Sequence, residues 1–147
     1  MEAPSRESNP LSYAEFTRQI IEEFRADGGR VGGPFEGSDL VLLTTTGARS
    51  GREHTVPLGY VRDGDRLLVV GSAGGAPRHP AWYHNVLAHP DVTVERGDEV
   101  FAAHAVPAVG AERDRLFDLV VAVTSGYADY QRNTTRTLPV VVLRRRE

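Results

Sequence analysis

The feature that most constrains the fold is an abrupt change of pattern between residues 42 and 58. Leu42 to Thr46 is an apolar, β-branched run that favours a strand. It stops at Gly47-Ala48-Arg49-Ser50-Gly51-Arg52, a turn with two glycines and two arginines, and a second extended segment follows from Glu53 to Leu58. Because strands joined by a tight turn pair antiparallel, the sequence predicts a hairpin with a cationic tip.

Strands and short turns alternate in the same way along much of the chain. Asp-Gly at 63–64 and Gly-Asp at 97–98 are hairpin signals between further extended segments. Pro57 indicates an edge or a bulge, because proline cannot donate to a central ladder. The expected strands are Asp39–Thr46, Arg52–Val61, Arg66–Gly71, Asp91–Arg96, Glu99–Val106 and Leu138–Leu143.

Apolar residues at helical spacing predict the remaining elements. Ser12 can cap a first helix, with Glu15 as its capping-box partner and Gly28 and Gly29 at its end. Pro80 suits the first position of another helix. The expected helices are 12–26, Ala81–Ala88, Ala111–Val123 (with Leu116, Leu119, Val120 and Val123 in register) and Tyr127–Thr134. Hairpins dominate this order, which favours a small antiparallel barrel with helices packed outside it.

Composition excludes several classes of function for this chain of 147 residues. The net charge of −3, from 17 basic and 20 acidic residues, argues against nucleic-acid binding. The absence of cysteine excludes disulfides, thiolate metal sites and cysteine nucleophiles, and it suits the cytoplasm. No apolar run approaches the ~20 residues that span a bilayer. We expect a flexible tail over residues 1–10 and a single domain over 11–147.

The cationic tip is a candidate anion site. Arg49 and Arg52 flank Ser50-Gly51, and guanidinium groups match phosphate and carboxylate oxygens. Glycines at 47 and 51 would let backbone N–H groups converge on one point. The tip is not a Walker loop, because the Gly-Lys-Ser/Thr ending is missing. The alternative is an ordinary hairpin turn with solvated arginines.

Two more segments are candidates for binding a flat ring. A glycine-rich loop from Gly71 to His79 leads into a helix start at Pro80, where free N–H groups attract an anion; the alternative is a plain connection with Trp82 as a core anchor. Tyr127 and Tyr130 share a helix face and could donate to the oxygen of an aromatic or quinoid ring; the alternative is amphipathic packing.

Metal and triad chemistry are not indicated. His79, His84 and His89 are spaced by five, so a helix would turn them away from one another, and His54 and His104 fall on separate expected strands. A nucleophile elbow, Gly-x-Ser-x-Gly, is also missing. We therefore expect no metal site.

Several blocks together resemble the deazaflavin-dependent nitroreductase and quinone reductase family of actinobacteria, over residues 33–143. The blocks are, in order, Leu42-Leu43-Thr44-Thr45-Thr46-Gly47-x-Arg49-Ser50-Gly51, Val56-Pro57-Leu58, Arg62-Asp63-Gly64-Asp65, Ser72-x-Gly74-Gly75, Pro80-x-Trp82-Tyr83-x-Asn85, His89-Pro90-Asp91, Tyr127-x-Asp129-Tyr130-Gln131 and Arg136-Thr137-Leu138-Pro139-Val140.

This resemblance implies an α+β split β-barrel, similar to flavin-mononucleotide oxidases of the pyridoxamine phosphate type, with about six mostly antiparallel strands and three or four helices. It implies the cofactor F420, an 8-hydroxy-5-deazaflavin with a phosphate and a polyglutamyl tail; flavin mononucleotide is the alternative. The residues implied to bind the cofactor are Arg49, Ser50, Gly51, Arg52, His54, Val56, Pro57, Gly71, Ser72, Ala73, Ala81, Trp82, Tyr83 and Asn85. Those implied to be catalytic are Ser72, Tyr127 and Tyr130.

The implied reaction is hydride transfer from the reduced deazaflavin to an electron-poor acceptor, a quinone or a nitroaromatic compound. The alternative is a non-catalytic carrier or storage module. Gly59 and Thr124 stand where the nitroimidazole-activating member has tyrosines, so the acceptor wall is less aromatic here. A homodimer is expected by analogy with split barrels. The helix at 12–26 and Arg144-Arg145-Arg146 could dock peripherally on anionic lipid. The alternative is a helix packed on the domain's own core and a solvated tail.

Overall fold

One seven-stranded antiparallel sheet organises the chain, in the order β2-β1-β5-β6-β7-β4-β3. The computed structural model describes residues 13–31 and 39–146, so the expected tail and the Ser12 cap lie outside the described residues. The strands are β1 (Leu40–Thr46), β2 (Glu53–Gly59), β3 (Val61–Asp63), β4 (Arg66–Val70), β5 (Asp91–Arg96), β6 (Glu99–Pro107) and β7 (Val140–Arg145). The helices are α1 (Tyr13–Ala26), α2 (Ala81–Ala88), α3 (Gly110–Val123) and α4 (Gly126–Arg132), with a 3₁₀ turn, η2 (Ala73–Gly75).

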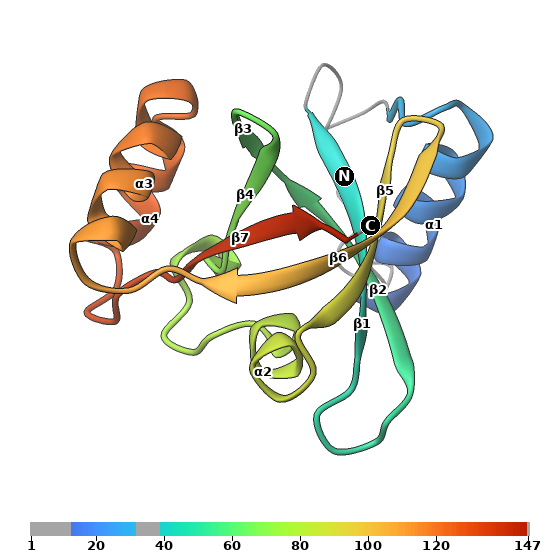
Figure 1. Ribbon diagram of the computed structural model, residues 1–147, viewed down its shortest axis with the longest axis horizontal. Coiled ribbons are helices and arrows are strands. Elements are labelled where there is room, and N and C mark those ends of the chain that lie inside the picture. The colour runs from blue at the N-terminus through green and yellow to red at the C-terminus, as the bar shows by residue number, and fades with distance from the viewer. Residues whose placement is uncertain (1–12, 32–38, 147) are drawn as a thin grey trace, which may run out of the picture.

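The sheet curls because its two edges are neighbours in the chain. β2 and β3 lie at opposite ends of the strand order, yet only Tyr60 separates them. The backbone N–H of Tyr60 bonds the Asp39 carbonyl at 3.3 Å, at the start of β1. The strands therefore curl around a shared interior, and α2 lies below β6 and beside β1 and β2 (Figure 1). This curled sheet confirms the expected split β-barrel.

Several expected boundaries need correction. Arg52–Val61 is not one strand: it divides at Tyr60, where the chain leaves the β1 ladder and joins that of β4, so the described residues form seven strands rather than six. Pro57 does lie on an edge strand, as expected, because β2 pairs only with β1. β7 begins at Val140 instead of Leu138 and continues to Arg145. Pro80 caps α2 from outside its first turn.

Three apolar clusters join the helices to the sheet. The inside of the curl holds α2, through Trp82 and Val86, against residues such as Val41 and Leu43. On the outside, α3 packs Leu116, Phe117 and Val120 onto β4 and β7. Val123 was expected in this stripe, but it is 65% exposed, at the last residue of α3.

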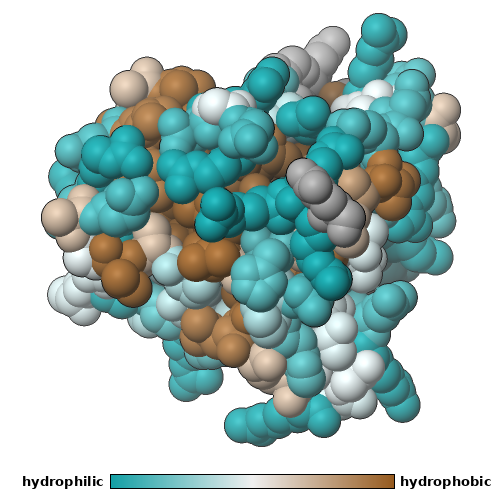
Figure 2. All heavy atoms as spheres, viewed as in Figure 1, coloured by the Kyte–Doolittle hydropathy of each residue, from teal (hydrophilic) through white to brown (hydrophobic). Residues whose placement is uncertain are grey.

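The third cluster also lies on the outside of the curl and holds α1 against β1. Ile20 and Phe24 are buried against Leu40 and Leu42 of β1, so the expectation that this helix packs on the domain's own core is confirmed. Polar side chains predominate on the surface near α1 (Figure 2), as expected for a helix whose apolar stripe faces inward. Gly28 and Gly29 end the helix with φ of 62° and 94°, as the sequence predicts.

Candidate functional site

Three hollows follow β2 from the hairpin tip to the seam with β3. The loop pocket, of about 930 Å³, lies between the hairpin tip and α2. The central pocket, of about 280 Å³, shares Val56 and Trp82 with it. The tyrosine pocket, of about 540 Å³, shares Gly59, Tyr127 and Tyr130 with the central one. A long ligand could therefore occupy the first two pockets and present one end to the third.

The hairpin tip uses most of its own backbone N–H groups. Gly47 N donates to the Arg52 carbonyl at 2.7 Å, and Gly51 N donates to the Gly47 carbonyl at 3.0 Å. The N–H of Arg52 bonds the Ser50 hydroxyl oxygen at 3.1 Å. The expected convergence of free N–H groups on an anion is therefore wrong for these three positions. Arg49 is the arginine that lines the loop pocket, so its guanidinium is the charged group that the tip offers to an anion there.

Asn85 locks the tip to the scaffold. Its Oδ1 accepts from the Ala48 N–H at 3.0 Å, and its Nδ2 donates to the Thr45 hydroxyl at 3.0 Å. Asn85 and Thr45 are the two buried polar residues among those described, with 8% and 1% exposure. A side chain on α2 thus sets the position of the cationic tip relative to β1.

The central pocket is narrow, with apolar walls on one side and a tight turn on the other. Its turn side is Ser72, Ala73 and Gly74, whose N–H groups make no hydrogen bond among the described residues. Ala73 has φ 46°, a left-handed conformation that is costly for a residue with a side chain. Free N–H groups at such a turn can bind an oxygen or an anion.

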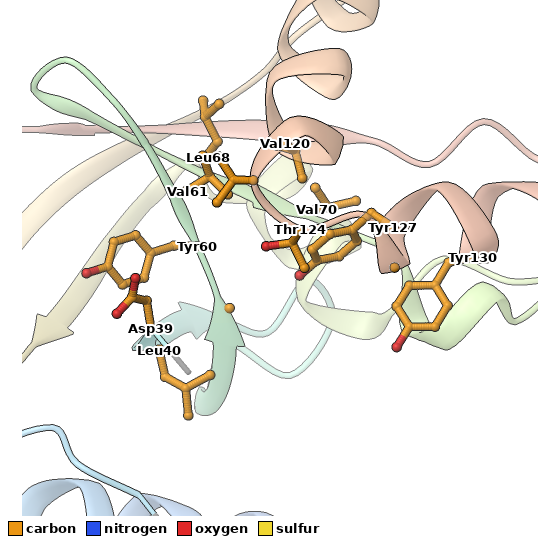
Figure 3. Close-up of a pocket in the computed structure, with 13 residues that line it drawn as sticks. Asp39, Leu40, Tyr60, Val61, Leu68, Val70, Val120, Thr124, Tyr127 and Tyr130 are labelled. Carbon is orange, nitrogen blue, oxygen red and sulfur yellow. The ribbon is translucent and has the colours of Figure 1, made fainter. Parts of the chain in front are cut away.

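The tyrosine pocket combines apolar walls with hydroxyl groups. Figure 3 shows Tyr127 and Thr124 directed into it from the α3–α4 side, with Tyr130 at its edge. The two tyrosine rings meet edge to face, with centroids 5.8 Å apart. Burial, and then the neighbouring Tyr130, raises the pKa of Tyr127, so its hydroxyl stays protonated as a donor. A methyl group at Gly59 would lie 3.3 Å from that hydroxyl oxygen, so glycine leaves it accessible.

The structure gathers most of the expected site residues along this row of pockets. The loop pocket contains Arg49, Ser50, His54, Ala81 and Asn85, and shares Val56 and Trp82 with the central pocket. The central pocket adds Pro57, Ser72, Ala73, Tyr127 and Tyr130. Gly51, Arg52, Gly71 and Tyr83 line none of the three. Tyr83 instead packs against His79 in a tilted arrangement, with ring centroids 4.8 Å apart.

The main residue that sequence reasoning left out of the site is Arg136. Its guanidinium donates to carbonyl oxygens of the Gly71–Ala76 turn and to Nδ1 of His79. Arg113 and Gln131 form a second group that holds Leu138. The sequence signal for these two groups of contacts was the block Arg136-Thr137-Leu138-Pro139-Val140. That block did not reveal which residues Arg136 and Leu138 contact.

The described residues contain neither a candidate metal site nor a helix that could span a membrane. In residues 13–31 and 39–146, no three histidine or acidic side chains form a group that could hold a metal ion. Within the same ranges, every helix is too short or too polar to cross a bilayer.

Comparison with known proteins gives consistent matches. A family model described as F420H(2)-dependent quinone reductase matches residues 16–145. An F420H(2)-dependent quinone reductase of Mycobacterium tuberculosis is 42% identical over 127 residues, covering 84% of this chain and 85% of the relative. A solved F420-H2 dependent reductase, FDR-A, has 42% identity and a TM-score of 0.66, over 71% of this chain and 93% of its own. Another structure, described as a domain-swapped dimer, has 38% identity and a TM-score of 0.68, over 90% and 99%.

Replacing Asn85 should loosen the hairpin tip. Asn85→Leu leaves the Ala48 N–H and the buried Thr45 hydroxyl without their partner, at a cost of about 1–3 kcal/mol for each unsatisfied buried group. Urea denaturation measures the loss. Asn133→Leu is the matched control at an exposed asparagine, where about 0.5 kcal/mol or less is expected. Equal losses in the two variants would contradict the locking role.

His79 should make the stability depend on pH. Burial lowers its pKa in the folded chain, with further contributions from Arg136 and His84. The unfolded chain therefore binds this proton more readily, and stability is lost as the pH falls below the ordinary histidine value of about 6.5. Thermal unfolding at pH 7.5 and 5.5 should show a smaller decline for His79→Asn than for the original chain. His104→Asn is the matched control, and an unchanged decline in His79→Asn would refute the assignment.

Proposed function

Because this chain belongs to the family of F420H(2)-dependent quinone reductases, we propose that it passes a hydride from reduced F420 to a quinone. The observation that carries the proposal is the row of three pockets along β2. The loop pocket, with its arginine, and the narrow central pocket suit a cofactor that has an anionic tail and a reactive ring. The tyrosine pocket, with its hydroxyl groups, adjoins the position of that ring.

Side-chain chemistry at the hairpin tip fits the cofactor's anionic groups. Three N–H groups of the tip are already hydrogen-bonded within the tip. The Arg49 guanidinium, supported by His54, would therefore hold the phosphate and tail. Because Arg49 is exposed, this attraction should weaken with added salt. Ser50 and Ala81 would border the same groups.

The middle of the row fits a flat ring. Val56, Pro57 and Trp82 offer apolar surface on one side, and the turn at Ser72 and Ala73 offers backbone N–H groups on the other. When bound, the reduced deazaflavin supplies the hydride. The chain would hold this ring next to the tyrosine pocket, which shares Gly59, Tyr127 and Tyr130 with the central one.

The acceptor would occupy the tyrosine pocket. Leu68, Val70 and Val120 give it walls that exclude water from a quinone ring. Tyr127 carries a protonated hydroxyl into the chamber, where it can donate to the acceptor oxygen that gains charge. Tyr130 and Ser72 are the other candidate donors at its border with the central pocket.

Nitroaromatic acceptors, dimerisation and membrane contact stay predictions. The two elements proposed for docking on lipid are engaged within the chain: α1 buries Ile20 and Phe24, and Arg145 in β7 pairs with Glu99 at 2.6 Å. A solvated tail was the alternative to docking for the arginines, and Arg144 and Arg145 are exposed residues at the end of β7. Sedimentation of the chain alone measures dimerisation, and co-sedimentation with anionic vesicles measures membrane binding.

The central experiment is an acceptor screen with chemically reduced F420 under anaerobic conditions. We expect oxidation of the cofactor, followed by its absorbance, with quinones such as menadione, and slower oxidation with nitroaromatics. A chain that binds the cofactor but oxidises it with no acceptor would be a carrier, and the proposed activity would be rejected.

The cationic tip should determine cofactor affinity. Arg49→Met removes a charge-assisted hydrogen bond, so the dissociation constant for F420 should rise about tenfold and its salt dependence should flatten. Fluorescence titration of F420 at two salt concentrations measures both effects. Arg115→Met removes an exposed arginine that pairs with Glu112 on α3, away from the pocket, and controls for overall charge. Equal effects of the two variants would contradict a specific contact at Arg49.

A further inference from the structure

Arg136 makes an unusual set of contacts around the turn that borders the central pocket. Its Nε donates to the Ala76 carbonyl at 2.8 Å, and its Nη2 donates to the Ser72 carbonyl at 2.7 Å. Its Nη1 bonds both the Gly71 carbonyl at 3.0 Å and Nδ1 of His79 at 2.9 Å. One guanidinium thus bonds the beginning of the turn at Gly71 and Ser72, its end at Ala76, and the nearby side chain of His79.

All of these acceptors are neutral. Among the described residues, no carboxylate forms an ion pair with Arg136, and burial lowers its pKa. A partly buried cation without a counter-ion costs desolvation energy, which its hydrogen bonds offset. Two turn bonds, Gly75 N to the Ser72 carbonyl and Ala76 N to the Ala73 carbonyl, complete the hold on this segment.

The backbone of the same residue is tied to the tyrosine helix. Gln131 of α4 donates from Nε2 to the Arg136 carbonyl at 2.8 Å, and its Oε1 accepts from Leu138 N at 3.0 Å. Arg113 of α3 donates to that Oε1 at 3.0 Å. Arg136 therefore connects the turn on one side of the central pocket to the helix that carries Tyr127 on the other.

We propose that Arg136 is a positioning residue, which sets the turn at Ser72–Gly74 against the tyrosines of α4 and so determines how tightly the central pocket holds its ring. This role rests on the proposed function, because the ring is that of the cofactor. Arg136 lines none of the three pockets, so it would act through the Ser72 and Gly71 carbonyls rather than by contact.

His79 makes this arrangement sensitive to pH. Arginine has only donors, so Nδ1 of His79 can accept from it only while that nitrogen is unprotonated. The ionisable groups that face His79 are Arg136, together with Tyr83 and His84 of α2. Among the described residues, no carboxylate bonds to His79. A proton on Nδ1 would remove the bond and place two cations side by side.

The first test compares Arg136→Met and Arg136→Lys with Arg132→Met, which removes an exposed arginine paired with Asp129 on the neighbouring helix. Fluorescence titration at pH 7.5 should show F420 affinity reduced at least tenfold in Arg136→Met and partly recovered in Arg136→Lys, whose ammonium cannot reach all the acceptors. Arg132→Met should match the original chain. Unchanged affinity in a folded Arg136→Met would overturn the proposal.

Hydrogen exchange of the chain without cofactor gives a second measurement. The amides of Gly75 and Ala76 should exchange at least tenfold faster in Arg136→Met and at the original rate in Arg132→Met. Equal protection in all variants would overturn the proposal. If the original chain fails to bind F420, the proposed function is rejected, and exchange alone decides whether Arg136 holds the turn.

The pH arm uses His79→Asn, which keeps an acceptor at this position but does not titrate. The ratio of the dissociation constants of the original chain and His79→Asn should rise at least threefold between pH 7.5 and 5.5. Taking the ratio cancels the titration of the cofactor and of the other histidines. Because this variant leaves Arg136 intact, the arm applies even if Arg136→Met does not fold, and a constant ratio would overturn the role of His79.

Discussion

The structure depends on one topological constraint: the two edge strands of its sheet are joined by a single residue. Tyr60 ends the pairing of β2 with β1, and Val61 begins the pairing of β3 with β4. A flat sheet could not place these edges so close, so the sheet curls, and the seam lies where the edges meet. Gly59, next to the seam, borders both the central and the tyrosine pockets. The candidate site thus follows from closure of the sheet, because the ladder is open there and side chains from α3 and α4 fill only part of the gap.

The cationic tip is a short loop that is fixed by hydrogen bonds within itself and to α2. Its bonds from Gly47 N and Gly51 N close the turn on itself, and Asn85 anchors it to α2. Such a loop would present an arginine to an anion from a backbone that is already fixed. The entropic cost of ordering the loop is already met on folding, which leaves the flexible Arg49 side chain as the part still to be ordered on binding.

Local patterns predicted most of the elements, whereas long-range contacts decided what the sequence missed. The β-branched run of β1, the edge position of Pro57 and the Asp-Gly turn at 63–64 depend on neighbouring residues, and each was recognisable. The division at Tyr60 was not, because residues 52–61 are extended throughout and only closure of the sheet separates them. Arg136 was missed as an organising residue because its four acceptors lie 57 to 65 residues away in sequence. The pocket residues were gathered through the resemblance, and their roles stay predictions.

Arg49 and Arg136 illustrate why the position of an arginine matters more than its charge. Arg49 is exposed, so solvent and salt screen its field, and its proposed role is to attract an anion from solution. Arg136 is partly buried, and its donors are committed to carbonyls and His79, so it has little left to offer a ligand directly. Its proposed contribution is geometric, because it holds the turn whose residues Ser72, Ala73 and Gly74 line the central pocket. Because its field reaches that pocket through a medium less polar than water, the same residue also favours negative charge on a group held there, and positioning and electrostatics act in the same direction.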